Sequence, residues 1–201
     1  MKLYILPGAC SMASNIALRE AGIAFEMSKV DKRTKRADGV DFLTINPKGY
    51  VPALKLDDGY VLTENVVVLQ YIADLNPAAK LAPPVGTRER YKFLEWLSYI
   101  NSEVHKSFSP LFSSEASDET KTYARNLLSK RFAYLESALE GKQYLMGDQF
   151  TVADAYLFTV LGWGAHAGVD IGPKLKSYVD RVKARPHVVE AMTAEGLIKH
   201  Q

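Results

Sequence analysis

The chain has 201 residues, of which 47% are apolar and 24% charged, as in a globular protein of one or two small domains. Its net charge of +2 gives no general attraction to nucleic acid or anionic lipid, and no apolar run approaches the roughly 20 residues of a membrane span. One cysteine excludes an internal disulfide and fits a cytoplasmic protein, and the break at Pro7 and Gly8 makes the apolar start a poor signal peptide.

Short apolar and alternating segments in the first ~75 residues predict strands and helices in the order β-α-β and then β-β-α. The segment KLYIL is a candidate buried strand, and the helical spacing that follows it ends at Gly22. The turn signal DDG lies between PALKL and YVLT and predicts a hairpin. The predicted strands are 2–6, 24–30, 52–56 and 60–63, and the predicted helices are 11–21, 40–44 and 64–74.

The Pro- and Gly-containing segment NPAAKLAPPVG separates this part from a remainder with helical periodicity throughout. The helices predicted there are 88–112, 122–139, 151–161, 178–184 and one that begins at Pro186. We therefore expect an α/β fold followed by an all-α fold. The predicted domains are an α/β domain at 1–76, a linker at 77–86 and an all-helical domain at 87–201.

Cys10 follows a Pro-Gly turn signal and stands where the first helix begins. The helix dipole and the unpaired N–H groups of a helix N-terminus stabilise a thiolate. Thioredoxin-like redox proteins use this frame with a C-x-x-C motif, but the window here is Cys10-Ser11-Met12-Ala13, so the second thiol is missing. Redox chemistry at Cys10 would need an outside thiol such as glutathione; a buried core cysteine is an equally good interpretation of position alone.

Two further segments of the first domain have features of a peptide-binding site. Pro52 enters a strand, which marks an edge or a bend and makes Val51-Pro52 a candidate cis bond; at an exposed edge, Val51 can pair with an extended peptide. Glu64 and Asn65 begin a helix whose N–H groups attract an anion while Glu64 attracts an ammonium, as in the γ-glutamyl end of glutathione. The simpler interpretations are an ordinary edge proline and capping of the helix by Thr63.

Other charged and polar groups are less specific. The basic cluster at 32–36 is either a solvated surface or a site for a terminal carboxylate. His105 belongs to a polar stripe on the predicted long helix, which lines a wet site or simply faces solvent. The stripe consists of Ser98, Asn101, Ser102, His105 and Ser109.

Thr151 and Asp154 have the spacing of a capping box, with Asp in place of the usual Glu or Gln. We interpret this motif as structural and expect its loss to cost on the order of 1 kcal/mol or more. The chain has no phosphate-binding loop, dinucleotide-binding or nucleophile-elbow motif. Its four histidines and single cysteine lack zinc-site spacing, so no metal is expected.

Five segments together resemble the glutathione S-transferases, and among them the bacterial beta class. They are MKLYILPGACSMAS, NPKGYVPAL, LTENVVVLQYIAD, RYKFLEWLSYINSEVHKSF and GDQFTVADAYLFTV, in the order and spacing of that class. The resemblance covers the whole chain. It implies a thioredoxin-like N-terminal domain and a C-terminal helical bundle, and a homodimer whose active site borrows residues from the partner.

The resemblance also implies roles for individual residues. Cys10 would form a mixed disulfide with glutathione, with Ser11 near its thiol. The cysteinyl backbone of glutathione would pair with Val51 before a cis Pro52, and its γ-glutamyl end would be held by Glu64 and Asn65. The glycyl carboxylate would be bound by Lys35. On the long helix, His105 and Lys106 would face the site. Ser98 stands where related sequences often carry Asn, and the Asn side chain is longer and reaches across the dimer.

The expected function is a detoxifying glutathione transferase that lowers the thiol pKa of bound glutathione and attacks hydrophobic electrophiles with the thiolate. Helix N–H groups, Ser11 and His105 would stabilise that thiolate, and Cys10 would support exchange of glutathione mixed disulfides. Two alternatives remain: thiol-disulfide exchange as the main activity, and glutathione-dependent sequestration of hydrophobic compounds without turnover. The second substrate would lie between the domains, near the Leu6–Ala9 turn and the helix that carries His105, with an apolar surface from Phe108, Phe112 and Trp163.

Overall fold

The computed structural model describes residues 1–199, and the chain divides into two compact units. The first unit comprises Met1–Ala82 together with the C-terminal segment from Ala184, and the second comprises Pro83–Lys183. The sequence assigned everything after residue 86 to the helical part, so the return of the C-terminal segment to the first unit is a difference from that expectation. Within residues 1–199, no helix combines the length and the apolar character that crossing a membrane requires.

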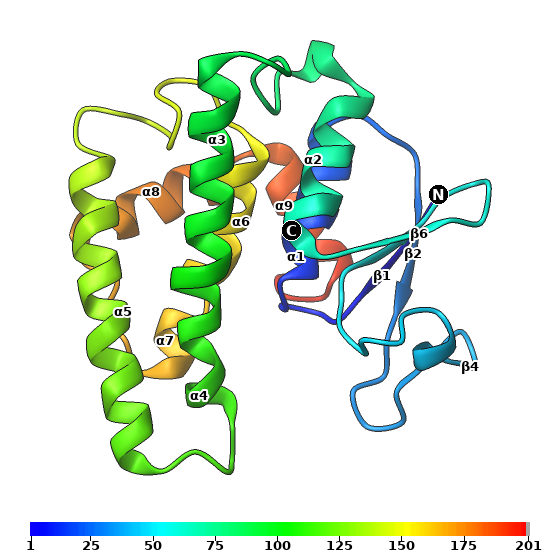
Figure 1. Ribbon diagram of the computed structural model, residues 1–201, viewed down its shortest axis with the longest axis horizontal. Coiled ribbons are helices and arrows are strands. Elements are labelled where there is room, and N and C mark those ends of the chain that lie inside the picture. Colours follow the sequence, from blue (N-terminus) through cyan, green and yellow to red (C-terminus); the bar gives the residue numbers. More distant parts are fainter. Residues whose placement is uncertain (200–201) are drawn as a thin grey trace. The chain divides into compact units, whose positions relative to one another are not determined.

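A four-stranded mixed sheet forms the centre of the first unit, with the strand order β2-β1-β5-β6 (Figure 1). Strand β1 is parallel to β2, and β5 is antiparallel to both of its neighbours. The strands are β1 (Lys2–Ile5), β2 (Glu26–Lys29), β5 (Ala53–Lys55) and β6 (Val61–Thr63). The inner position of β1 explains its continuous apolar sequence, because the central strand is buried on both faces.

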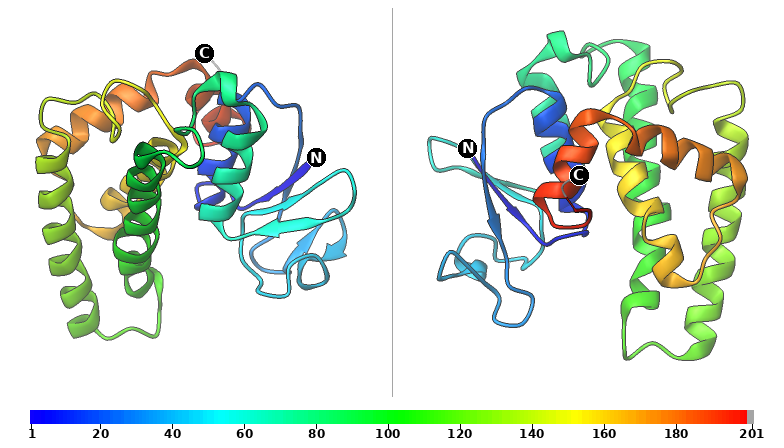
Figure 2. Two further views of the ribbon diagram at one scale, coloured as in Figure 1. Left: turned by 45° about the horizontal axis from the view of Figure 1, so that its top comes forward. Right: turned by 180° about the vertical axis from the view of Figure 1, so that it is seen from behind.

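Three helices complete the first unit: α1 (Ser11–Glu20), α2 (Asn65–Leu75) and α9 (Pro186–Ala194). Helix α1 packs against β1, α2 and α9, and Figure 2 shows α9 in red beside the blue α1. Most of α1 is therefore buried, from Ser11 to Leu18. The predicted order β-α-β and then β-β-α is confirmed, and α9 is an addition to it.

The segment between β2 and β5 differs from the sequence prediction. A helix was expected at 40–44, but Val40–Asp41 (β4) pairs with Arg36–Ala37 (β3) in a two-residue hairpin. Only Phe42–Thr44 is helical, as the short 3₁₀-helix η1. The reason is local, because Asp38 and Gly39 both adopt positive φ and turn the chain. The Phe42 ring then packs against Tyr4 in a small core.

The second unit is all helical, as expected. After the short η2 (Pro77–Ala79) and the unit boundary, the predicted helix 88–112 forms as four successive segments: α3 (Arg88–Tyr99), η3 (Ile100–His105), η4 (Lys106–Phe108) and α4 (Ser109–Phe112). The segment η3 is a π-helix, a rare geometry that is frequent at functional sites. The remaining helices are α5 (Asp118–Ala138), α6 (Val152–Leu161), α7 (Gly164–Ala167) and α8 (Pro173–Lys183).

Two differences in this unit have separate causes. Helix α8 begins at Pro173, five positions before the predicted start at 178, because the Glu136 carboxylate of α5 accepts the N–H of Lys174 at 2.8 Å and caps the helix. Helix α7 was not predicted, since four residues are too few for a periodic pattern.

Helix α6 is buried along its whole length, and the predicted capping box is present at its start. The Asp154 carboxylate is fully buried and accepts four hydrogen bonds: Leu145 N–H at 2.8 Å and Thr151 N–H, Thr151 Oγ1–H and Tyr178 O–H at 2.9 Å. Burial raises the pKa of this carboxyl, and the four donors oppose the shift. The capping box thus caps the N-terminus of α6 and also joins α6 to α8 through Tyr178.

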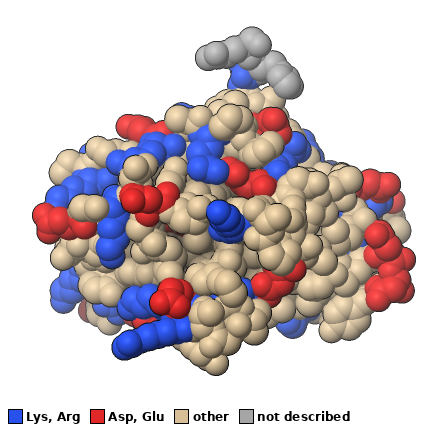
Figure 3. Space-filling view, turned by 90° about the horizontal axis from the view of Figure 1, so that it is seen from above, with Lys and Arg blue, Asp and Glu red and all other residues tan. Residues whose placement is uncertain are grey.

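Charged side chains of both signs are interspersed on the face drawn in Figure 3. This agrees with the near balance of 25 basic and 23 acidic residues.

Candidate active site

Cys10 is the residue that immediately precedes α1, and its backbone is helical at φ −60° and ψ −22°. Its thiol lies 3.1 Å from the carbonyl oxygen of Val51. A carbonyl can only accept, so Cys10 donates this hydrogen bond as a neutral thiol. The carbonyl of Cys10 in turn accepts the side-chain N–H of Asn65 at 3.2 Å. The structure therefore brings together Cys10, Val51 and Asn65, which are far apart in the sequence.

The turn that carries Cys10 is held from both sides. Ser11 Oγ accepts the N–H of Leu6 at 3.2 Å and lies 3.3 Å from the Leu6 carbonyl oxygen, so this hydroxyl closes the turn. Gly8 adopts φ +72°, a conformation that favours glycine, and donates its N–H to Glu195 Oε2 at 2.8 Å. The other Glu195 oxygen accepts the side-chain N–H of Asn15 on α1 at 3.0 Å.

Sequence reasoning missed Glu195, which follows α9 and lies 187 positions from Gly8. Only 3% of Glu195 is exposed, and burial raises the pKa of its carboxyl, against the hydrogen bonds from Asn15 and Gly8 that lower it. A single glutamate in a polar C-terminal segment carries no signal that could have revealed this contact. It depends entirely on α9 packing against α1.

The Val51–Pro52 bond is cis, in agreement with the candidate isomer named from the sequence. It forms a bend before β5, which is an inner strand, so the proline marks the bend and not an edge strand. Buried Asn46 supports the bend, because its side-chain N–H donates to the carbonyl of Tyr50 at 2.7 Å. Val51 itself is half-buried.

Glu64 is the residue before α2, and it adopts φ +67°, which is uncommon for a residue other than glycine. Among the described residues, no side chain caps α2 at Glu64. The capping role considered for Thr63 is therefore not observed, since Thr63 Oγ1 instead accepts from Lys48 at 2.9 Å. The Glu64 carboxylate lies 2.7 Å from the Lys48 ammonium. Asn65 points inward and accepts from Ser14 Oγ at 2.9 Å.

Lys35 belongs to the same unit but to the exposed loop between β2 and β3. Its φ is +56°, and its N–H donates to the carbonyl of Asp31 at 2.9 Å. The neighbouring residues of the predicted basic cluster are exposed as well. The cluster is thus available to a ligand carboxylate but makes no hydrogen bond to Cys10 or Val51 among the described residues.

The other candidate residues belong to the helical unit. His105, at the end of η3, has Nδ1 at 2.6 Å from the hydroxyl of Tyr156, which donates to Asn101 Oδ1 at 3.0 Å. Because the single tyrosine proton is used toward Asn101, the proton in the first bond belongs to His105 Nδ1. Ser98 and Lys106 are exposed on the same helical run.

His105 is expected to be neutral near pH 7. Burial, and secondarily the charge of Lys106, lower its pKa from 6.5 to about 4. Since the unfolded chain binds this proton near pH 6.5, the stabilising contribution is fully present above that pH and lost as the pH falls toward about 4.

An NMR titration should give a midpoint near 4 for the imidazole resonance that disappears in His105→Gln, the value to which burial lowers the pKa. In urea unfolding, His105→Gln should lose less stability than the wild type between neutral and acid pH. A midpoint near 6.5 would contradict the prediction, because it would mean a solvated imidazole.

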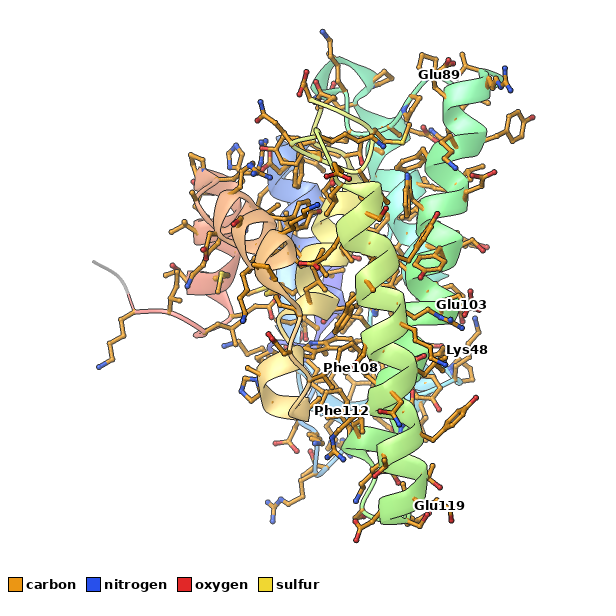
Figure 4. The ribbon with its side chains drawn as sticks, turned by 90° about the vertical axis from the view of Figure 1, so that its left-hand side faces the viewer. Lys48, Glu89, Glu103, Phe108, Phe112 and Glu119 are labelled. Carbon is orange, nitrogen blue, oxygen red and sulfur yellow. The ribbon has the colours of Figure 1, made fainter. Side chains whose placement is uncertain are left out.

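The rings of Tyr156 and Trp163 contact His105. The Trp163 ring lies edge-on to His105, with ring centroids 4.9 Å apart. Phe108 and Phe112, which are labelled in Figure 4, stack with ring centroids 6.0 Å apart. Phe108 is buried, whereas 55% of Phe112 is exposed. Phe108, Phe112 and Trp163 thus form one aromatic cluster within the helical unit, in which Phe108 exposes no surface.

Comparison with known proteins agrees with this geometry. The family model for the glutathione S-transferase N-terminal domain matches residues 1–74, and that for the C-terminal domain matches residues 96–186. The chain is 46% identical over 200 residues to glutathione S-transferase GstA of Escherichia coli O157:H7, covering 98% of this chain and 100% of the relative.

Two solved structures are similar over 98% of this chain and 100% of their own. They are a beta-class glutathione S-transferase of Sphingomonas chungbukensis, with 50% identity and a TM-score of 0.95, and a sphingomonad glutathione S-transferase complexed with glutathione, with 49% identity and a TM-score of 0.95.

A thioredoxin-like sheet unit with a cysteine at the start of its first helix, followed by a helical unit, defines the class of protein. The chain belongs to the glutathione S-transferase family, and bacterial beta-class enzymes are among its structural relatives. It is therefore an enzyme of the glutathione transferase type, with glutathione as its co-substrate.

Proposed function

We propose that glutathione binds along the first unit, between the cis Val51–Pro52 bend and the N-termini of α1 and α2. The hydrogen bond between the Cys10 thiol and the Val51 carbonyl carries this proposal. It means that the only thiol of the chain and a backbone acceptor for an extended peptide lie at the same point. The sphingomonad relative with glutathione in its structure supports the assignment.

In this arrangement each part of glutathione has a partner of suitable chemistry. The cysteinyl N–H donates to the Val51 carbonyl and takes the place of the Cys10 thiol, which is thereby released next to the glutathione sulfur. Glu64 binds the γ-glutamyl ammonium, Asn65 and the start of α2 support the same end, and Lys35 binds the glycyl carboxylate.

The reaction is conjugation. The glutathione thiolate attacks an electrophilic carbon of a hydrophobic substrate, a carbon–sulfur bond forms, and the leaving group departs with its electron pair. N–H groups at the start of α1 and the Ser11 hydroxyl stabilise the thiolate. From the helical unit of a homodimer we propose Ser98, His105 and Lys106 as further contacts, with His105 acting as a neutral group.

Cys10 supports a second reaction, the exchange of glutathione mixed disulfides in a cytoplasmic setting. Its thiolate attacks the glutathione sulfur of a mixed disulfide and releases the other thiol, and a second glutathione thiolate then resolves the adduct to glutathione disulfide. One observation favours this second activity: the Cys10 thiol is half-buried and lies at the Val51 carbonyl, where the proposal places the cysteinyl group of glutathione.

Calorimetry should detect glutathione binding at millimolar concentrations or below, and steady-state turnover of a chlorinated aromatic should follow it. Turnover distinguishes catalysis from sequestration, which would give tight binding without product. S-Methylglutathione serves as the matched ligand, because it fills the peptide site but cannot react. No heat with either peptide would refute the proposed function.

A further inference from the structure

Lys48 belongs to none of the roles described above, yet it lies at the proposed γ-glutamyl end of the ligand. Its ammonium is 2.7 Å from Glu64 Oε1 and 2.9 Å from Thr63 Oγ1. The side chains of Lys48 and Glu64 are 52% and 61% exposed. An ion pair this exposed adds little to stability, and both charged groups remain accessible to a ligand.

The loop that carries Lys48 is built to hold it in place. Asn46 is 2% exposed and accepts the N–H of Lys48 at 3.2 Å through Oδ1. Its carbonyl accepts the N–H of Gly49 at 2.9 Å, and its side-chain N–H donates to Tyr50 at 2.7 Å. The buried Asn46 side chain thus holds the backbone of both Lys48 and Tyr50, next to the cis bend, while Glu64 and Thr63 hold the Lys48 ammonium.

We propose that Lys48 binds the α-carboxylate of the γ-glutamyl group while Glu64 binds its α-ammonium. This inference rests on the proposed function. In the free protein the Lys48 ammonium and the Glu64 carboxylate neutralise each other. An α-amino acid zwitterion carries the same two charges, so its carboxylate can pair with Lys48 while its ammonium pairs with Glu64. The exchange leaves no charge without a counterion, and it makes the pair specific for a ligand end with both groups.

Lys48→Met tests the assignment with three S-methylated peptides. S-Methylglutathione carries both groups, glutaryl-Cys-Gly keeps the carboxylate but lacks the ammonium, and 4-aminobutyryl-Cys-Gly keeps the ammonium but lacks the carboxylate. We expect the variant to weaken the first two by about tenfold, as for loss of one charge-assisted hydrogen bond. The third should bind the variant at least as tightly as the wild type, because its ammonium takes Glu64 from Lys48 and offers that lysine no carboxylate in return.

Lys55→Met is the matched control, because Lys55 is exposed on β5 of the same unit and makes no contact with Glu64 among the described residues. It should leave all three affinities unchanged. Glu64→Gln should give the mirror pattern and weaken the two peptides that carry the ammonium. Thermal unfolding of each variant checks that the fold is intact.

Three results would overturn the inference. Equal weakening of all three peptides by Lys48→Met would mean that the lysine only positions the loop. Tighter binding of S-methylglutathione to the variant would mean that the lysine competes with the ligand for Glu64. Failure of S-methylglutathione to bind the wild type would remove the proposed function as well, which separates that failure from the other two.

Discussion

Cys10→Ala is expected to abolish glutathione mixed-disulfide exchange and to leave conjugation of an aromatic halide measurable. Exchange needs a protein thiolate to form the mixed disulfide, and Cys10 is the only cysteine of the chain. Conjugation needs only the glutathione thiolate, which the start of α1 and Ser11 would stabilise without Cys10. Intact mass spectrometry after treatment with glutathione disulfide should show one glutathione adduct on the wild type and none on the variant.

Cys10→Ser is the matched control, because its hydroxyl can still donate to the Val51 carbonyl that the thiol contacts at 3.1 Å. It should behave like Cys10→Ala in exchange and bind S-methylglutathione as the wild type does. Loss of both activities in Cys10→Ala would contradict this division of roles, because conjugation by the glutathione thiolate would then depend on Cys10 as well. Exchange that persists in the variant would mean that bound glutathione performs the exchange alone.

Asp154→Ala should cause the largest loss of stability of any single change considered, about 3–5 kcal/mol. The substitution removes the carboxylate acceptor of buried donors on Leu145, Thr151 and Tyr178, and the Tyr178 hydroxyl keeps the more distant backbone carbonyl of residue 154 at 3.4 Å. Tyr178 is 1% exposed, and Thr151 is 2% exposed, so water cannot easily replace the carboxylate. Thr151→Ala removes only the hydroxyl partner and should cost about 1 kcal/mol. Urea unfolding of both variants measures the two values.

Asp148→Ala is the control for this series, because Asp148 is exposed in the loop that precedes α6. It should change stability by less than about 0.5 kcal/mol. The double variant of Thr151 and Asp154 should cost less than the sum of the two single changes, because the residues share hydrogen bonds. An Asp154→Ala variant no less stable than Thr151→Ala would contradict the four-donor arrangement.

Much of the fold could be predicted because its signals are local. The buried strand β1, the hairpin turn between β5 and β6, and the capping box of α6 each depend on residues within a few positions of one another. The expectation failed where local signals were weak, as at 40–44, where the turn at Asp38 and Gly39 favours a hairpin over a helix. Four-residue α7 carried no periodic signal at all.

The sequence by itself determined which chemical groups this enzyme has: one cysteine at a helix start, a proline at a strand entry, and an acidic residue before α2. Only the tertiary structure decided what these groups contact, including the Cys10 thiol at the Val51 carbonyl, Glu195 on the Gly8 turn and Lys48 on Glu64. The reason is physical, because these sequence signals depend on neighbouring residues, whereas the contacts join segments that meet only when the chain packs.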